Sequence, residues 1–409
     1  MSLREEALAL HREYRGKLAV VSKVPVRDAH DLSLAYSPGV AEPCKEIAQN
    51  AELVYEYTNR GNVVGVISDG TAVLGLGDIG PLAGMPVMEG KAVLFKRFAD
   101  IDSVPICLDT KDVDQLVQTI RLLEPSFGGI NLEDISGPRC FEIEERLKAS
   151  MQIPVFHDDQ HGTAAVVCAA LLNALKVVGK TIAGIKVVVN GAGAAGVAIT
   201  KMLLLVGVTP TNIRLCDRPG ILFPNGGTAN PYQEELAKLT NPGDERGDLA
   251  HALTGADVFI GVSAPNIVSE TMVKAMNERA IVFGMANPVP EIMPDRAIAA
   301  GAMIAGSGRS DLPNQINNII GFPGIFRGAL DVRATQINEA MKVAAIRAIA
   351  DLIPEHELGV ENIIPKAFDR RIVPAVATAV AKAAMATGVA KSPQTAEELH
   401  AGFIRRGLL

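Results

Sequence analysis

Cysteine is scarce in this sequence, and no C-x-x-C pair occurs. The five cysteines are odd in number and far apart along the chain: Cys44, Cys107, Cys140, Cys168 and Cys216. This pattern argues against both a disulfide framework and a thiolate zinc site. Scattered free thiols are typical of a reducing compartment, so we expect a cytoplasmic protein.

Runs of lysine and arginine are absent as well, and basic residues do not alternate with aromatic ones. With a net charge of −7, this argues against a nucleic-acid partner. The most apolar window, AAVVCAALLNALKVVG, is interrupted by Asn173 and Lys176 and is short for a bilayer span. Residues 1–18 mix acids and bases, which is typical of an amphipathic helix and not of a signal peptide. We expect no membrane segment.

The chain of 409 residues is long for one hydrophobic core, so the sequence predicts two domains. Hydrophobic residues make up 48% and charged residues 21%, which is the composition of a globular protein with a large core. We place an N-terminal domain over 1–160 and a second domain, with C-terminal helices, over 161–409.

Strand and helix patterns alternate along the first domain. Residues 63–70, 72–80 and 91–99 are expected as short strands, or as strands followed by a helix, because glycines bound them. Helices are expected over 112–125 and 141–150, and a strand over 153–156. Alternation of this kind predicts an α/β fold with parallel sheets built from right-handed βαβ units.

Two acidic doublets follow consecutive predicted strands. Glu133 and Asp134 come just beyond one strand, and Asp158 and Asp159 just beyond the next. The carboxyl ends of parallel strands share one edge of the sheet, so these side chains are expected to be neighbours. Capping of the following helix is the alternative for the second doublet. Because capping does not explain both doublets, we favour a divalent metal site, and all-oxygen ligands favour Mg²⁺ or Mn²⁺.

A glycine-rich turn opens the second domain. The predicted strand IKVVVN runs into G-A-G-A-A-G and then a helix, which is the context of a doubly wound, Rossmann-type dinucleotide site. The candidate contacts are Gly191, Ala192, Gly193, Ala194, Ala195 and Gly196. Tight strand–helix packing is the alternative reading of these glycines. Asp217 ends the next strand and favours NAD, whereas the adjacent Arg218 keeps NADP as an alternative.

Motifs across the whole chain resemble malic enzyme, in particular its short bacterial form. They include SLAYSPGVA, SDGTAVLGLGDIG, PVMEGKAVLFKRFADID, NLEDI, FHDDQHGTA, NGAGAAG, MANPVPE and LPNQINNIIGFPGIFRGAL. The resemblance spans residues 10–385 and implies oxidative decarboxylation of (S)-malate to pyruvate and CO₂ with NAD(P)⁺. It also implies a homodimer.

The resemblance assigns roles position by position. Lys91 is the implied base, Tyr36 the implied acid and Asp158 the partner of Lys91. The implied metal ligands are Glu133, Asp134 and Asp159, and the implied substrate contacts are Asn287 and Asn318 together with Tyr36 and Lys91. Asn287 also follows a predicted strand of the dinucleotide half. One position departs from the family: longer, animal-type members carry an arginine that grips malate where this chain has Ala72.

The chemistry sets a requirement for the base. Oxidation at C2 of malate needs the hydroxyl proton to leave, so a lysine base must work near neutral pH. We expect burial and a nearby metal charge to lower the pKa of Lys91. Tyr36 is suited to protonate the enolate that remains after CO₂ leaves.

Two other functions use the same motifs. A metal-dependent oxaloacetate decarboxylase of the same superfamily would share the decarboxylation residues. A nonenzymatic dinucleotide sensor would need the glycine-rich turn alone, and the full set of candidate ligands argues against it.

Overall fold

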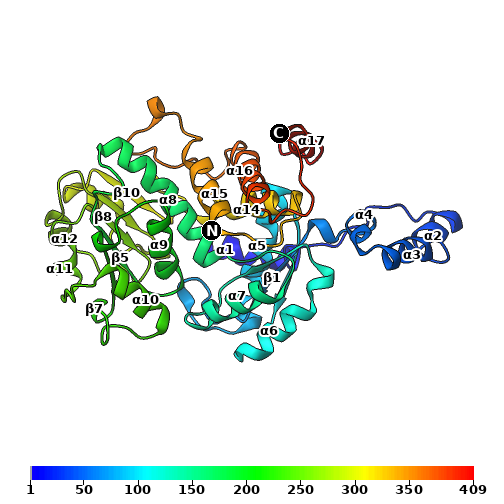
Figure 1. Ribbon diagram of the computed structural model, residues 1–409, viewed down its shortest axis with the longest axis horizontal. Coiled ribbons are helices and arrows are strands. Elements are labelled where there is room, and N and C mark those ends of the chain that lie inside the picture. Colours follow the sequence, from blue (N-terminus) through cyan, green and yellow to red (C-terminus); the bar gives the residue numbers. More distant parts are fainter. Residues whose placement is uncertain (1) are drawn as a thin grey trace.

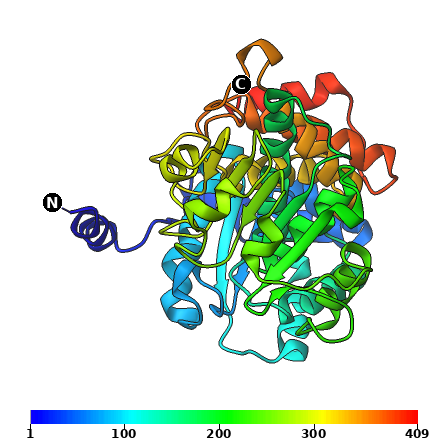
Figure 2. The ribbon, with the colours of Figure 1, turned by 90° about the vertical axis from the view of Figure 1, so that its left-hand side faces the viewer.

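The computed structural model describes residues 2–409, and the helices at its N-terminal end stand apart from the body when the two views are taken together (Figure 1 and Figure 2). These helices are α1 (Leu3–Tyr14), α2 (Ala29–Ala35), α3 (Ala41–Gln49) and α4 (Val54–Tyr57), and none of them contains a buried residue. Helices α2 to α4 form a projecting arm, which we define as residues 24–57 (Figure 1). Helix α1 projects separately, as the second view shows (Figure 2).

A four-stranded parallel sheet with the order β2-β1-β3-β4 forms the centre of the first half. Its strands are β1 (Val63–Ser68), β2 (Asp102–Cys107), β3 (Gly129–Leu132) and β4 (Val155–His157). Every residue of β1, β3 and β4 is buried, as expected for apolar runs in a sheet covered on both faces. The connecting helices are α5 (Pro81–Ala99), α6 (Val113–Leu122) and α7 (Arg139–Ser150).

Two expectations for this half need correction. Residues 72–80 do not form a strand; they make a loop with a single 3-10 turn at Leu74–Leu76. Residues 91–99 are the second half of α5, a 19-residue helix that begins at Pro81. Glycines separate the apolar residues of 72–80, and Pro81 is suited to the first turn of a helix, so backbone preferences decide both outcomes.

A six-stranded sheet with the order β10-β9-β8-β5-β6-β7 forms the second half. Its strands are β5 (Val187–Asn190), β6 (Ile213–Asp217), β7 (Gly220–Ile221), β8 (Val258–Gly261), β9 (Ile281–Gly284) and β10 (Ile304–Ser307), and β7 pairs antiparallel. The helices around it are α9 (Ala194–Leu205), α10 (Pro231–Thr240), α11 (Leu249–Leu253), α12 (Glu270–Lys274) and α13 (Pro294–Ala299). The chain leaves β5 for β6 on one side and returns to β8 on the other, so the switch point lies beside β5.

Helix α8 (Asp158–Val178) joins the two sheets and packs against α9 and α15. Among residues 2–409 it is the one helix long and apolar enough to cross a bilayer, but 72% of its apolar window is buried inside the protein. Such burial is typical of a core helix. The two sheets, with helices between their strands, confirm the predicted α/β class.

The last helices return to the first half of the molecule (Figure 1). They are α14 (Phe322–Asp331), α15 (Glu339–Ala350), α16 (Ile372–Ala386) and α17 (Ala396–Arg405). Phe322 and Phe326 of α14 lie edge-on to Phe95 of α5, with ring centroids 4.7 and 5.1 Å apart. The predicted second domain therefore supplies core packing to the first.

Candidate active site

A cavity of about 1010 Å³ lies where the two sheets face each other. One wall comes from α5, from the loop after β3 and from the first turns of α8. The opposite wall comes from the turns after β5, β8 and β9, including Gly193, Ser263 and Asn287. The carboxyl ends of the strands from both halves thus border one cavity, which is where open α/β sheets bind ligands.

Three carboxylates gather at the floor of this cavity. One oxygen each of Glu133, Asp134 and Asp159 lies within 4.8 Å of the others. Glu133 and Asp134 follow β3, and Asp159 belongs to the first turn of α8. The geometry fits a hard divalent ion, because such ions take several carboxylate oxygens.

The electrostatics of this cluster favour a cation. Burial and the neighbouring Asp159 carboxylate raise the pKa of Asp134 to about 8, and burial also raises the pKa of Glu133. Asp134 Oδ2 is buried and has no hydrogen-bond partner within residues 2–409. Asp134 also adopts a φ of 54°, which is uncommon for a residue other than glycine and is often found at functional sites. The free Asp134 oxygen and the two neighbouring carboxylates can together supply part of the oxygen shell of Mg²⁺ or Mn²⁺.

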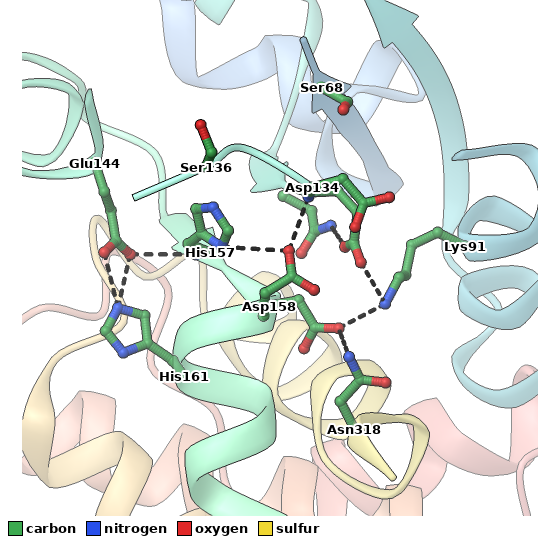
Figure 3. A network of polar contacts seen from close by, with 12 residues as sticks. Ser68, Lys91, Asp134, Ser136, Glu144, His157, Asp158, His161 and Asn318 are labelled. Atoms are coloured by element: carbon green, nitrogen blue, oxygen red, sulfur yellow. Dashed lines mark hydrogen bonds and ion pairs between the residues drawn. The ribbon is translucent and has the colours of Figure 1, made fainter. Parts of the chain in front are cut away.

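Asp158 does not cap helix α8. The N-cap of this helix is His157, which makes no side-chain capping bond. Asp158 instead turns inward, and its Oδ2 accepts hydrogen bonds from Lys91 Nζ at 2.6 Å and from Asn318 Nδ2 at 2.6 Å (Figure 3). A Cβ at Gly162 would lie 1.8 Å from Asp158 Oδ1, so the glycine of the HDDQHGTA motif makes room for this carboxylate.

Lys91 points from α5 toward the carboxylates and is 7% exposed (Figure 3). Its ammonium lies 2.9 Å from Glu133 Oε1 and 4.4 Å from the centre of the Phe322 ring. Burial lowers the pKa of Lys91, but attraction to Asp158, Glu133 and Asp159 outweighs burial and raises the pKa above its ordinary value. From the sequence we expect a lowered pKa for Lys91. In the chain alone the pKa is raised instead, because the neighbouring carboxylates stabilise the charged ammonium.

A buried carboxylate on α7 braces the first turn of α8. Glu144 accepts a hydrogen bond from the backbone N–H of His157 at 3.2 Å and from His161 Nε2 at 2.8 Å (Figure 3). Lys148 Nζ lies 2.6 Å from the same carboxylate, and Lys342 Nζ lies 3.2 Å from His161 Nδ1. Glu144 and Lys342 were not predicted from the sequence, because a single acid or base within a helix carries no local signal of a buried role.

The glycine-rich turn has the geometry of a phosphate cradle. Gly191 adopts a φ of 106°, and a Cβ there would lie 2.5 Å from the Val262 carbonyl oxygen. A Cβ at Gly196 would lie 1.8 Å from the Gly191 oxygen, so both glycines are required by close packing. A Cβ at Gly193 would meet nothing within 4 Å, so this residue faces open space at the start of α9. Backbone N–H groups at a helix N-terminus favour a pyrophosphate.

The other dinucleotide residues occupy several places around this turn. Ala194 and Ala195 line the cavity, whereas Ala192 is buried and its carbonyl accepts from Gln233 Nε2 at 2.9 Å. Asp217 ends β6, and its Oδ1 accepts from the backbone N–H of Arg218 at 2.8 Å. The Arg218 side chain is exposed. The glycine-rich turn therefore contains both a residue needed for packing, Ala192, and residues open to a ligand, Ala194 and Ala195.

Among the implied substrate residues, Lys91, Asn287 and Asn318 line the cavity, but Tyr36 does not. Tyr36 follows α2 on the projecting arm and is 69% exposed. Ala72 does line the cavity, and its N–H donates to the Asp134 carbonyl at 2.9 Å. A single chain therefore assembles the implied base, metal ligands and amide contacts without the implied acid.

Comparison with known proteins finds two family models that match successive parts of the chain. Residues 15–148 match the family described as malic enzyme, N-terminal domain, and residues 160–385 match malic enzyme, NAD binding domain. The chain is 60% identical to the bifunctional malic/malolactic enzyme of Bacillus subtilis, with 98% of this chain and 97% of that protein aligned. It is 56% identical to the NAD-dependent malic enzyme of Geobacillus stearothermophilus, over 92% of this chain and 78% of that protein.

A solved structure agrees in its fold. The malic enzyme from Pyrococcus horikoshii superposes with a TM-score of 0.94 at 49% sequence identity, covering 99% of this chain and 95% of that chain. At 99% coverage, the aligned residues include both sheets.

Proposed function

Because the chain belongs to the malic enzyme family, we infer that it oxidises and decarboxylates (S)-malate to pyruvate and CO₂ with reduction of NAD(P)⁺. One observation carries this function: the cluster of Glu133, Asp134 and Asp159 borders the same cavity as the dinucleotide turn. A metal-held hydroxy acid and a nicotinamide ring can meet only if their sites share one cavity.

We propose that Glu133, Asp134 and Asp159 hold Mg²⁺ or Mn²⁺. An ion held there would polarise the hydroxyl and carboxylate oxygens of malate and stabilise the negative charge that develops as CO₂ leaves, and its charge would offset the carboxylates that raise the pKa of Lys91. Glu133 and Asp134 are buried and Asp159 is partly exposed, so water has limited access to the floor of the cavity and charge interactions there are strengthened. Asn287 and Asn318 line the same space and orient the substrate by hydrogen bonds.

Lys91 is the proposed base. Its Nζ approaches the carboxylate cluster from α5, and Asp158 and Glu133 fix it in one position. A base held in one geometry takes the hydroxyl proton as hydride leaves C2, and it later supplies the proton that the acid passes to C3. Asp158 acts on Lys91, and Asn318 holds Asp158 from the other side.

The proposed acid, Tyr36, requires a second subunit. The arm carries exposed apolar side chains along its length, including Val26, Leu32 and Leu34, which are 56%, 50% and 63% exposed. Burial of such side chains favours association, and the cavity lacks Tyr36 in a single chain. We propose a homodimer in which Tyr36 of the partner subunit completes each cavity, with both arms used in the same way.

The proposed cofactor is NAD, with NADP as the alternative. Asp217 at the end of β6 is placed to accept hydrogen bonds from an adenine ribose. The exposed Arg218 is placed to meet a 2′-phosphate instead. The five scattered cysteines support a cytoplasmic location.

The deciding experiment supplies malate and Mn²⁺ with each nicotinamide cofactor in turn. We expect the absorbance of the reduced cofactor to rise, pyruvate to accumulate in equal amount, and a chelator to stop both. Absence of reduction with either cofactor would contradict the proposed function.

A second activity is favoured by one relative. The Bacillus subtilis protein, 60% identical, is named a bifunctional malic/malolactic enzyme. The corresponding reaction here converts malate and one proton to lactate and CO₂ without net change in the cofactor. Lactate formation in the same assay, with less reduced cofactor than CO₂, would show this activity.

A further inference from the structure

The cavity has few cationic side chains for the two carboxylates of malate. Malate carries two carboxylates, and Ala72 stands where the longer family members have a gripping arginine. Within residues 2–409, the lysines that line the cavity are Lys17 and Lys91. Lys91 is committed, because Asp158 and Glu133 hold its ammonium at 2.6 and 2.9 Å. His11 also lines the cavity, but its Nδ1 bonds to the Ala7 carbonyl at 2.7 Å.

Lys17 is anchored on the same helix that carries Lys91. Its backbone N–H donates to Glu89 Oε2 at 3.2 Å, and its Nζ donates to the Pro86 carbonyl at 2.7 Å. A Cβ added at Gly90 would lie 3.7 Å from Lys17 Nζ. Pro86, Gly90 and Lys91 of α5 all line the cavity. The Lys17 ammonium therefore lies on the wall formed by α5 and not on the opposite wall, which contains the glycine-rich turn.

The Lys17 ammonium has capacity for a ligand. An ammonium offers three donors, and the Pro86 carbonyl uses one. Across the described chain, Lys17 forms no ion pair with an acidic side chain. A cation held at a cavity wall with free donors is suited to a carboxylate.

We propose that Lys17 binds the second carboxylate of malate, the one that does not share the metal with the hydroxyl group, and so replaces the arginine absent at Ala72. The proposal rests on the proposed function for its substrate. Lys17 thereby selects four-carbon dicarboxylates over hydroxy acids with one carboxylate. The contact is present before and during oxidation, so it contributes to binding more than to turnover.

The test compares Lys17→Met and Lys17→Arg with Lys382→Met, an exposed lysine of α16. We expect Lys17→Met to raise KM for malate at least about tenfold with kcat within about twofold, as for loss of a charge-assisted bond. Lys17→Arg should recover most of the affinity, and Lys382→Met should match the parent protein.

A second measurement separates this proposal from the proposed function. Calorimetry with Mn²⁺ but no nicotinamide cofactor gives the Kd of malate and of (S)-2-hydroxybutyrate, in which a methyl group replaces the second carboxylate. Lys17→Met should raise the Kd of malate about tenfold or more and leave the Kd of (S)-2-hydroxybutyrate unchanged. Equal weakening of both ligands, or of neither, would overturn the role of Lys17. A parent protein that binds malate without oxidising it would contradict the proposed function alone.

Discussion

Lys91 Nζ lies 2.6 Å from Asp158 Oδ2 inside the protein, and Asn318 Nδ2 holds the same oxygen from the far side. Hydrogen bonds to this one oxygen therefore join three segments that are distant in sequence: α5, the start of α8 and the turn before α14. The relationship fixes the Lys91 ammonium against the cluster of Glu133, Asp134 and Asp159.

Lys91→Ala should lower kcat at least about 10²-fold, as for loss of an acid–base group. It should also lower the free energy of unfolding by about 3–5 kcal/mol, because Asp158 is left buried without its cation. Steady-state kinetics and thermal unfolding measure the two effects. The double variant Lys91→Met with Asp158→Asn is the control. It should regain stability but not turnover, and recovery of turnover would contradict the role of Lys91.

Tyr36 of the partner subunit can be tested by mixing subunits. Tyr36→Phe and Lys91→Ala should each be inactive as homodimers. Coexpressed in equal amounts with different tags, they form hybrid dimers in which one cavity has both residues, and activity of about a quarter of the parent is expected for random pairing. If each subunit used its own Tyr36, no hybrid cavity would be complete. Activity no higher than the two homodimers would then contradict the arrangement.

Glu144 should position the metal ligand Asp159. Glu144→Gln removes the charge that bonds to His157 N–H and His161, so the affinity for Mn²⁺ should fall about tenfold. Electron paramagnetic resonance of Mn²⁺ without substrate measures this directly. Glu142→Gln, an exposed residue of the same helix, is the matched control and should keep the parent affinity.

The same variant has a predicted pH signature. Burial raises the pKa of Glu144, but His161, Lys148 and Lys342 outweigh burial and hold the pKa well below its ordinary value of 4.5. The folded pKa is thus below the unfolded one, so Glu144 stabilises the fold above about pH 4.5, and this stabilisation is lost as pH falls through the folded pKa. The stability gap between parent and Glu144→Gln should be full at neutral pH and shrink in acid. A gap that is constant with pH would contradict the charged role.

Asp217 should decide part of the cofactor preference. Asp217→Ala removes the acceptor at the end of β6 and should raise KM for NAD about tenfold, as for a lost bond to a charged group. The KM for NADP should change less, because a 2′-phosphate does not need that acceptor. Asp295→Ala, an exposed residue of α13, is the control. An equal effect on both cofactors would contradict a ribose contact.

Local patterns predicted the parts of the site that follow strands. The doublets at Glu133 and Asp158 and the turn at Gly191 each come at a strand end, and strand periodicity with glycine spacing places them without tertiary information. The capping alternative for Asp158 was wrong, because its side chain turns inward to Lys91. The roles of all these residues stay predictions until the variants are measured.

Long-range packing decided what the sequence could not predict. The position of Tyr36 depends on the direction in which the arm, residues 24–57, projects from the body. Nothing within the SLAYSPGVA motif specifies this direction. The raised pKa of Lys91 depends on Asp158, which is 67 residues away along the chain. The packing of Phe322 on Phe95 depends likewise on a return of the chain to its first half.

Helix α8 has a mechanical consequence. It begins with Asp158 and Asp159 and continues unbroken for 21 residues, a rod of about 30 Å at 1.5 Å per residue, before ending at Gly179 with a φ of 65°. Bending such a rod at its middle would break backbone hydrogen bonds, so the helix keeps its two ends at a fixed separation. The carboxylates at its start and the dinucleotide sheet that follows Gly179 are therefore joined by one stiff element.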